Sequence, residues 1–483
     1  MQKGCKVTLT IEDISAEGQG IGRTEDGMVV FVSGALPGDT ARVELTRVKK
    51  NYALGQTLEI LHASEFRRSE EWCPYQDACG GCPLGRLTYE KQLALKERQV
   101  RSRLERIGGL KPDMEPIVGM EGPARYRNKA VMKISTGGLV TKKGGVQVPV
   151  HEPRIGFYRA KSHDVCDCSD CRLQVPAAMA AAEATRRFMT EDHICSYDER
   201  WDKGLMKQMT VKTAFGTGEV MVVYDIHGKG IPNAAKLVAY LDEAVYEAGA
   251  SLESVVIRND KKTETIAGKS TITDIVTIAD EAADDAIELQ FEISANSFYQ
   301  VNHDQMEKLY SIVRRYCREA RKGMAGDRTA GDRADGPVVL DLYCGIGTIG
   351  LCVADLAGRV HGIEVVKDAV IDANRNAVIN GIVNATYTCG KAEELIPQWA
   401  AEGDFAADIA ILDPPRAGCR PQLLHAIADA SIPHIIYVSC DPATLARDVK
   451  LLHEEGYELL SAAPIDLFPN AGHCECAVLM SKK

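Results

Sequence analysis

A cysteine directly after a strongly apolar run is the residue whose position most suggests chemistry. The run from Ile435 to Val438 is typical of a buried strand, and Cys440 follows it, just before Asp441 and Pro442. Because proline cannot continue a strand ladder, we expect the thiol where the strand ends. Ligands of open α/β sheets bind at that edge, and a thiol there is a candidate nucleophile. The alternative is an inert cysteine packed in the core.

A glycine-rich turn and two acidic strand ends precede this thiol. Residues 338–350 predict a strand, a turn of the form Gly-x-Gly-x-x-Gly and the start of a helix. Glu364 ends the next predicted strand, where a carboxylate can accept the ribose hydroxyls of a nucleoside, and Asp413 ends a later one. Such a turn suits either a nicotinamide cofactor or S-adenosylmethionine. A dehydrogenase has no need for a strand-end Asp413-Pro-Pro followed by Cys440, so the pattern favours a methyltransferase.

Three further thiols, Cys73, Cys79 and Cys82, lie close together in the first quarter of the chain. Pro, Asp and Gly surround them, which argues against a place in a hydrophobic core. The chain has 16 cysteines, and in a reducing compartment such numbers indicate metal binding or catalysis rather than disulfides. Structural zinc usually takes paired cysteines, and only Cys79 and Cys82 have that spacing. Three clustered cysteines with a distant fourth favour an iron–sulfur cluster.

The fourth ligand is expected in the segment 163–171, which contains Cys166, Cys168 and Cys171. The spacing alone does not choose among these three thiols. Cys166 and Cys168 could also form a separate site or be surface thiols.

The charge of the chain is unevenly distributed. The net charge is −11, yet the segment Arg86–Ser162 contains 17 Lys and Arg against 7 Asp and Glu, a balance of +10. Such asymmetry predicts a face that binds a polyanion. Cations alternate with aromatic residues at 125–129 and 156–161, which suits phosphate contact combined with base stacking. The alternative is a charged face that only contacts water.

Short β-rich runs dominate the first 61 residues, at 6–11, 27–32, 41–45 and 53–61. Turn signals at 18–22 and 36–39 separate them, and this spacing predicts a small barrel of the OB-like kind. Four cations and one ring near its later strands are candidate RNA contacts: Arg42, Arg47, Lys49, Lys50 and Tyr52.

Helical spacing of apolar residues predicts a helix over 87–107, ended by Gly108-Gly109. Residues 178–290 predict a mixed α/β scaffold with a strand pair over 208–224. The Gly-, Asp- and Arg-rich run Arg321–Gly336 predicts a surface loop.

The motifs together resemble a known family. The segments at 18–22, 29–32 and 35–39 are similar to the TRAM domain found on RNA-modifying enzymes. The rest resembles the RNA uracil-5-methyltransferase family, in its iron–sulfur branch that acts on 23S ribosomal RNA. The matching segments are Cys73–Cys82, Ser297–Asn302, Asp341–Gly345, Asp413–Gly418, Val438–Pro442 and His473–Glu475.

This resemblance implies roles for particular residues. Cys440 would be the nucleophile and Glu475 the base. The fourth ligand of a [4Fe–4S] cluster, beside Cys73, Cys79 and Cys82, would be Cys171, although the neighbouring Cys166 and Cys168 depart from the family pattern. The residues that would bind S-adenosylmethionine are Gln300, Tyr343, Glu364 and Asp413.

The residue chemistry fits these roles. Uracil C5 is a poor nucleophile, and a thiolate that adds to C6 makes C5 nucleophilic enough to take a methyl group. A base must then remove the C5 proton so that the thiol can leave. Glu475 lies on a predicted strand of alternating apolar residues, 473–480, where a salt bridge is its alternative role.

The predicted architecture is a multidomain α/β protein with three parts. These are an OB-like TRAM barrel at 1–62, a central α+β domain with the cluster and the basic segment at 63–290, and a Rossmann-like S-adenosylmethionine-dependent methyltransferase domain at 291–483. We expect a cytoplasmic monomer that acts on 23S ribosomal RNA, with no membrane partner, because no long apolar run and no signal peptide are found. The competing functions are a dehydrogenase, an RNA-binding protein without catalysis, and a tRNA uracil-5-methyltransferase, a branch that typically lacks the barrel and the cluster.

Overall fold

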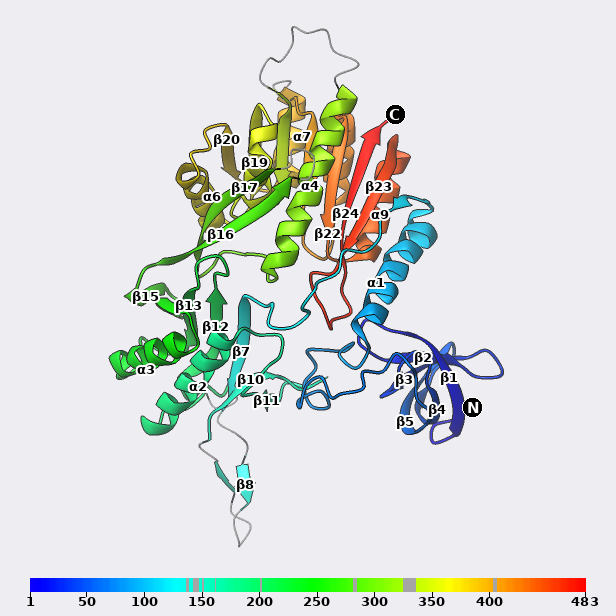
Figure 1. Cartoon of the computed structure of the whole chain (residues 1–483), viewed down its shortest axis with the longest axis vertical. Coiled ribbons are helices and arrows are strands. Elements are labelled where there is room, and N and C mark those ends of the chain that lie inside the picture. Colours follow the sequence, from blue (N-terminus) through cyan, green and yellow to red (C-terminus); the bar gives the residue numbers. More distant parts are fainter. Residues whose placement is uncertain are drawn as a thin grey trace. The chain divides into compact units, whose positions relative to one another are not determined.

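The structure is a computed structural model of the chain (Figure 1), and it describes residues 1–135, 139–141, 147–149, 152–160, 162–199, 202–280, 285–324, 336–402 and 406–483. These residues form two compact units. The first consists of Met1–Arg98, Tyr158–Asp164 and Phe468–His473, and the second consists of Gln99–Phe157, Val165–Leu467 and Cys474–Lys483. The domain boundaries expected after residues 62 and 290 remain predictions.

The first unit begins with a barrel, as the sequence predicts, and the barrel is closed and has five strands where four runs were expected. Its strands alternate buried and exposed residues, and the inward side chains of Leu9, Val30, Val32 and Val43 form its core. Around the barrel the order is β1-β2-β3-β5-β4. The strands are β1 (Lys6–Ile14), β2 (Gly20–Arg23), β3 (Val29–Ser33), β4 (Thr40–Val48) and β5 (Tyr52–His62).

The interpretation of residues 18–22 only as a turn is wrong, because β2 begins within it. A Cβ atom at Gly20 would lie 2.7 Å from the carbonyl oxygen of Ala35, and one at Gly22 would lie 2.8 Å from that of Thr10. These two glycines therefore permit close approach of neighbouring backbone inside a strand, in addition to the turn made at Gly18.

The predicted helix over 87–107 is confirmed as α1 (Tyr89–Arg103), which continues as a π-helical turn over Leu104–Gly108. It ends where predicted, since Gly109 has a φ of 70° and its N–H donates to the carbonyl oxygen of Leu104.

The second unit contains a seven-stranded sheet that includes the predicted strand pair over 208–224, observed as β12 and β13. Helix α2 (Pro176–Glu191) packs on β12 and helix α3 (Ala234–Glu247) on β14. The strand order is β11-β10-β7-β12-β13-β14-β15. Their bounds are β7 (Lys129–Ser135), β10 (Arg154–Tyr158), β11 (Val165–Asp167), β12 (Met206–Thr213), β13 (Glu219–Ile226), β14 (Ser251–Arg258) and β15 (Thr263–Gly268).

Two separate hairpins accompany this sheet. Strands β8 (Leu139–Thr141) and β9 (Gln147–Pro149) pair with each other, and so do the longer strands β16 (Thr271–Asp280) and β17 (Asp285–Ser294).

An eight-stranded, mainly parallel sheet forms the C-terminal part of the second unit and confirms the Rossmann-like prediction. Its order is β20-β19-β18-β21-β22-β24-β23-β6, and β24 runs antiparallel to both of its neighbours. The strands are β6 (Asp113–Met114), β18 (Val338–Leu342), β19 (Arg359–Glu364), β20 (Ala385–Cys389), β21 (Ile409–Leu412), β22 (His434–Ser439), β23 (Tyr457–Ile465) and β24 (Glu475–Lys482).

Helices lie on both faces of this sheet (Figure 1). Helix α4 packs on β22, β23 and β24, while α9 packs on β22 and β23. All residues of β21 and β22 are buried, as expected for parallel strands that are covered on both sides. The helices are α4 (His303–Met324), α5 (Thr348–Cys352), the 3₁₀ turn η2 (Ala354–Leu356), α6 (Lys367–Ile379), α7 (Ala392–Glu402), α8 (Pro421–Asp429) and α9 (Pro442–Glu454).

The loop predicted over Arg321–Gly336 falls largely on residues 325–335, which lie outside the described residues. Its first four residues form the end of α4. Among the helices of the described chain, none is long and apolar enough to cross a membrane.

Candidate active site

The carboxyl ends of β18, β21 and β22 meet at one edge of the sheet. The register pairs Leu342 with Leu412 and Leu412 with Tyr437, so the residues that follow these strands emerge side by side. Asp413 follows β21, and Cys440 follows β22 directly. Asp413 and Cys440 therefore lie at the edge of the sheet where ligands of open α/β proteins bind.

Cys440 directly follows β22, and Glu475 is the first residue of the neighbouring strand β24. In the antiparallel pairing of these strands Ser439 is the partner of Cys476, so Cys440 and Glu475 each lie one residue beyond this pair, at the same end of the ladder. Helix α9 begins immediately after the thiol, where the Asp441 carboxylate accepts the N–H groups of Ala443 and Thr444 at 2.8 and 3.2 Å. The cysteine is half-buried at a strand end and is not a core residue.

Burial governs the protonation of both groups. It raises the pKa of Glu475 well above its usual range, and the nearby Asp413 carboxylate raises it further. Burial also raises the pKa of Cys440 to about 11, with Glu475 adding to the effect. At neutral pH the nucleophile candidate is therefore a thiol, and the raised pKa of Glu475 favours the protonated form of that carboxyl group.

Arg416 acts in the opposite sense on both groups. Its guanidinium lowers the pKa of Cys440 and that of Glu475, so it favours the thiolate and the carboxylate. Arg416 was not among the site residues predicted from the sequence. Its position directly after Asp413-Pro-Pro, at a predicted strand end, is the sequence feature that could have pointed to a role in the site.

A buried carboxylate, Asp448 on α9, anchors the segment that carries Arg416. Its Oδ2 accepts the Tyr437 hydroxyl at 2.7 Å and the Cys419 N–H at 2.8 Å. In addition, the Thr444 hydroxyl donates to the Arg416 carbonyl oxygen at 3.2 Å. Residues 413–419 are thus fixed against β22 and α9.

A hollow with an accessible volume of about 30 Å³ lies beside these residues, and Gln300, Tyr343 and Asp413 are among those that line it. Asp341 also lines it and is fully buried. Its Oδ2 accepts the Gly350 N–H at 2.8 Å, while its Oδ1 has no hydrogen-bond partner among the described residues. Burial raises the pKa of Asp341 to about 7 and that of Asp413 to about 7.

The glycine-rich turn is held from one side by Glu364. The Glu364 carboxylate accepts the N–H groups of Gly345 at 3.1 Å and Val366 at 2.8 Å. Tyr343 adopts a φ of 66°, and its hydroxyl donates to Glu393 at 2.8 Å. The hollow therefore offers a buried unpaired acceptor and a glycine-rich turn, which fits a nucleoside-containing cofactor with a cationic group.

The predicted cluster ligands are found in both units. In the first unit Cys73 is buried, Cys79 and Cys82 are half-buried, and the Gly81 N–H donates to Cys79 Sγ at 3.4 Å. In the second unit Cys171 is half-buried. A hydrogen bond with Cys168 is the main cause that lowers the pKa of Cys171, to about 6.

No group of three or more His, Cys, Asp or Glu side chains within the described ranges is arranged to hold a metal ion. The metal ligands Cys73, Cys79, Cys82 and Cys171 thus remain a prediction from the sequence.

The expectation of base stacking at residues 125–129 is wrong for the aromatic residue, because Tyr126 is only 1% exposed. Arg125 is also used structurally, since its guanidinium donates to the Cys171 carbonyl oxygen at 2.7 Å and to Asp170 at 2.6 Å. Burial lowers the pKa of Lys129. In the second cluster Tyr158 is 40% exposed, and Lys161 lies outside the described residues.

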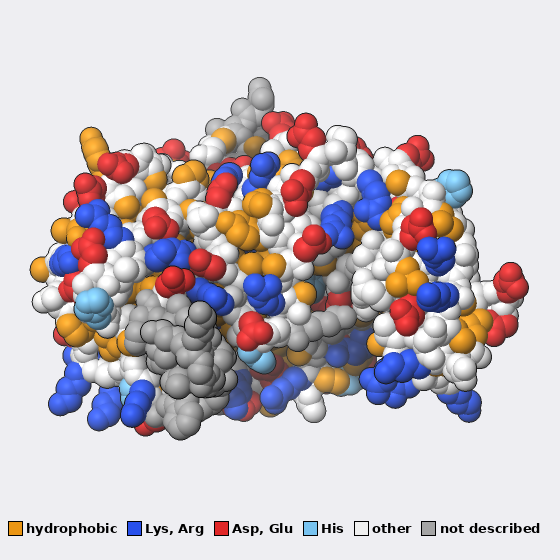
Figure 2. Space-filling view, turned by 90° about the horizontal axis from the view of Figure 1, so that it is seen from below, with side chains coloured by type: hydrophobic (Ala, Val, Ile, Leu, Met, Phe, Trp, Pro, Cys, Tyr) orange, Lys and Arg blue, Asp and Glu red, His pale blue; other side chains and the backbone are white. Residues whose placement is uncertain are grey.

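Exposed cations are nevertheless present in the basic segment, at Arg101, Arg103, Arg106 and Lys111. Figure 2 shows Lys and Arg side chains interspersed with acidic ones over the face that it presents. On the barrel, the candidate RNA contacts Arg47, Lys49, Lys50 and Tyr52 are exposed, whereas Arg42 pairs with Glu59 at 2.6 Å.

Comparison with known proteins assigns the chain to a family. A family model described as tRNA (Uracil-5-)-methyltransferase matches residues 241–483, and the TRAM domain model matches residues 2–58. A protein of Bacillus cereus (strain ATCC 10987), named an uncharacterized RNA methyltransferase, is 37% identical over 486 residues, covering 100% of this chain and 98% of that protein. A protein of Caldanaerobacter subterraneus with the same description is 38% identical over 481 residues, covering 99% and 98%.

A solved structure shares the fold across nearly the whole chain. It is the Pyrococcus abyssi tRNA (uracil-54, C5)-methyltransferase in complex with S-adenosyl-L-homocysteine, with a TM-score of 0.71 and 24% identity, covering 98% of this chain and 100% of that chain. The chain belongs to the RNA uracil-5-methyltransferase family, carries an N-terminal TRAM domain, and is a S-adenosylmethionine-dependent RNA methyltransferase.

Proposed function

We propose that this protein methylates uracil C5 in 23S ribosomal RNA and forms 5-methyluridine through a covalent adduct between Cys440 and uracil C6. The observation that carries the proposal is that Cys440 and Glu475 lie at the same end of the β22–β24 ladder, at the carboxyl edge of the sheet, beside the hollow that Gln300, Tyr343 and Asp413 line. A thiol and a carboxyl group at one edge supply the nucleophile and the base that the reaction needs.

The proposed reaction begins when the Cys440 thiolate adds to C6, which places the electrons of the C5–C6 double bond on the ring as an enolate. C5 then takes the methyl group. Glu475 removes the C5 proton, the C5–C6 double bond forms again, and the Cys440–C6 bond breaks. Arg416 supports both ionised groups, because it lowers the pKa of each.

The residues proposed to hold S-adenosylmethionine are Gln300, Tyr343, Glu364 and Asp413. Three of them line the hollow, and Glu364 fixes the glycine-rich turn at its edge. The cofactor would supply the electrophilic methyl group.

A [4Fe–4S] cluster on Cys73, Cys79, Cys82 and Cys171 is proposed from the cysteine spacing and the family resemblance. No step of the reaction is assigned to it. We also propose that the enzyme acts as a monomer in the cytoplasm.

Transfer RNA is the second candidate substrate, and a specific observation favours it. The Pyrococcus abyssi tRNA enzyme shares the fold over 98% of this chain, a span that includes residues of the barrel. The presence of the barrel therefore does not distinguish an enzyme for 23S ribosomal RNA from one for tRNA, contrary to the expectation that the tRNA branch lacks it. The proposal for 23S ribosomal RNA accordingly rests on the cysteine motif.

Mapping 5-methyluridine in 23S ribosomal RNA and in tRNA from a strain that lacks this gene tests the substrate. We expect at least one 23S uridine to lose its methyl group, and a plasmid encoding the intact protein to restore it, whereas the Cys440→Ala variant should not. Loss confined to tRNA would replace the first candidate with the second.

A further inference from the structure

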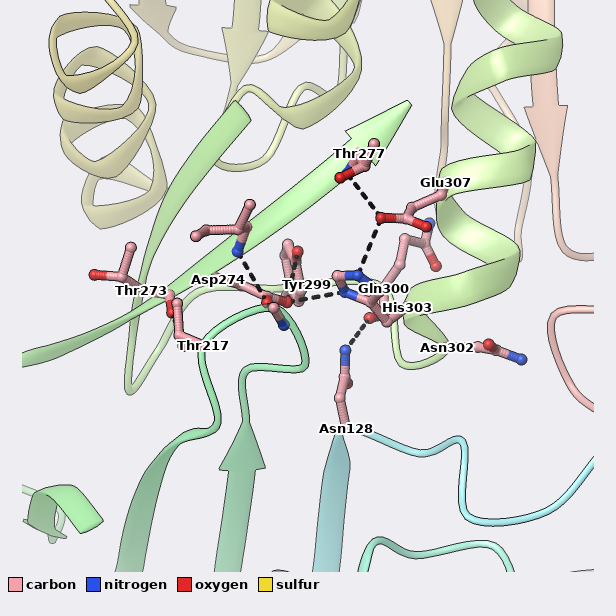
Figure 3. Close-up of polar contacts among 12 residues, drawn as sticks. Asn128, Thr217, Thr273, Asp274, Thr277, Tyr299, Gln300, Asn302, His303 and Glu307 are labelled. Atoms are coloured by element: carbon pink, nitrogen blue, oxygen red, sulfur yellow. Dashed lines mark hydrogen bonds and ion pairs between the residues drawn. The ribbon is translucent and has the colours of Figure 1, made fainter. Parts of the chain in front are cut away.

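A buried histidine, His303, lies between two carboxylates, three residues after Gln300 in the chain (Figure 3). His303 Nδ1 is 3.1 Å from Asp274 Oδ2, and its Nε2 is 3.1 Å from Glu307 Oε1. Asp274 is fully buried and His303 nearly so. None of these three residues has a role in the proposed reaction.

This cluster joins three other parts of the second unit. The Asp274 Oδ1 accepts the Gly216 N–H at 2.7 Å, from the turn between β12 and β13. From the same turn, the Phe215 ring stacks on His303 at 5.5 Å between centroids with 12° between the planes. The Glu307 carboxylate, on α4, accepts the Thr277 N–H of β16 at 2.7 Å.

The segment 299–303 is attached to this cluster at both of its ends. The Tyr299 hydroxyl donates to Asp274 Oδ2 at 3.0 Å, and His303 contacts the same oxygen. Gln300 lies between these attachments, and its own carbonyl oxygen accepts the Asn128 side-chain amide at 2.8 Å. Figure 3 shows Tyr299 and His303 at the Asp274 carboxylate, and Gln300 next to His303 with its contact to Asn128. The backbone that presents Gln300 to the hollow is thus fixed on each side.

The arrangement requires a protonated imidazole. A neutral imidazole can donate from only one nitrogen, whereas the imidazolium donates from both, and here each nitrogen faces a carboxylate oxygen. Although burial lowers the pKa of His303, the two carboxylates outweigh it and raise that pKa to about 10. The cation is therefore present throughout the neutral range.

We propose that His303 is a positioning residue for the cofactor: held as a cation between Asp274 and Glu307, it fixes the segment 299–302 so that Gln300 stands in the hollow ready to bind S-adenosylmethionine. This inference rests on the proposed role of Gln300.

Binding of S-adenosylhomocysteine to the full chain, measured by titration calorimetry, tests the inference without RNA. His303→Gln keeps a polar side chain but loses the charge and one of the two hydrogen bonds. We expect about tenfold weaker binding, the size of effect given by loosening one hydrogen-bonded contact. With RNA present, the KM for S-adenosylmethionine should rise by a similar factor, while kcat at saturating cofactor stays within about twofold. The reason is that the variant loses cofactor binding that is equally strong in the ground state and the transition state.

The control is His425→Gln. His425 also pairs with a carboxylate, Glu455 at 2.8 Å, but it is half exposed on α8 and does not line the hollow. This variant should bind S-adenosylhomocysteine like the wild type. Because His303→Gln could fail to fold, Glu307→Gln serves as the second variant. It removes one charge and keeps an acceptor for Thr277, and we expect weakening of about threefold.

A folded His303→Gln or Glu307→Gln variant with wild-type affinity would overturn the inference, and so would a fall in kcat with an unchanged KM. Gln300→Ala separates this failure from that of the proposed function. If Gln300→Ala binds weakly while His303→Gln binds normally, only the positioning role is wrong. If Gln300→Ala binds normally, the role assigned to Gln300 is wrong and this inference falls with it.

Discussion

Cys440 has surroundings that oppose its ionisation in the free enzyme. Burial and the Glu475 carboxyl group raise the pKa of its thiol, and Arg416 offsets part of that rise. Reactive cysteines are usually found in electropositive surroundings. The thiol is therefore largely protonated at neutral pH, which protects the nucleophile from unwanted alkylation and oxidation.

The two neighbours should shift the pKa of Cys440 in opposite directions. Arg416→Gln removes a positive charge and should raise it, while Glu475→Gln removes a negative charge and should lower it below about 11. The pH dependence of iodoacetamide labelling of the Cys440 peptide, followed by mass spectrometry, measures this pKa. Arg420→Gln, at the start of α8, should leave the labelling curve unchanged. A shift of the same sign in both variants would contradict this account.

The roles of Glu475 and Cys440 can be distinguished by the step at which the reaction of each variant stops. If Glu475 removes the C5 proton only after methyl transfer, Glu475→Gln should attack and methylate the uridine and then stall, because the adduct cannot eliminate without losing that proton. We expect a methylated, covalent enzyme–RNA species that survives denaturing gel electrophoresis.

This species should be absent from Cys440→Ala and from the double variant Cys440→Ala, Glu475→Gln, since neither can form the bond to C6. Normal turnover by Glu475→Gln would exclude Glu475 as the essential base. His473 would then be the next residue to test.

At the scale of elements, the sequence predicted best where an apolar run ends in a chain-breaking residue. β22 was recognisable because its buried run stops before Asp441-Pro442, and β21 because Pro follows Asp413. The glycines of β2 carried no such signal, since glycine serves both in turns and where backbones approach closely.

Side-chain orientation was less predictable than strand position. Tyr126 lies between two arginines in the sequence but is buried, because alternation along a local run does not show which side faces the core. The contact of His303 with Asp274 was also out of reach, since the two residues are 29 positions apart. The same holds for Asp448, whose partners Tyr437 and Cys419 are 11 and 29 residues away.

The segment 166–171 should supply one cluster ligand. Cys171→Ser is expected to lose the cluster, whereas Cys166→Ser and Cys168→Ser should retain it, because the family resemblance places the ligand at Cys171. Anaerobically purified protein should contain about four irons per chain, as a four-thiolate cubane requires, and the iron content of the three variants tests the assignment. Stoichiometric zinc without iron would refute the cluster itself, and loss of iron in Cys168→Ser would refute the choice of ligand.

For the whole molecule, the unequal distribution of charge predicts how it binds RNA. The chain as a whole is acidic, so affinity should come from the local excess of cations in Arg86–Ser162. The Arg125 guanidinium donates to the Cys171 carbonyl oxygen, and Lys129 is partly buried. The exposed Arg103, Arg106 and Lys111 are therefore the better candidates for phosphate contact.

Changing Arg103, Arg106 and Lys111 together to Gln should weaken RNA binding and make it less sensitive to salt, since each lost phosphate contact lowers the slope of log K against log salt by roughly one. Fluorescence anisotropy with a labelled RNA at several salt concentrations measures both quantities. The matched control changes three exposed cations outside the segment, Lys229, Lys261 and Lys262, and should leave the slope unaltered. If the control lowers the slope as much as the triple change does, binding follows net charge, and the basic segment has no special part in it.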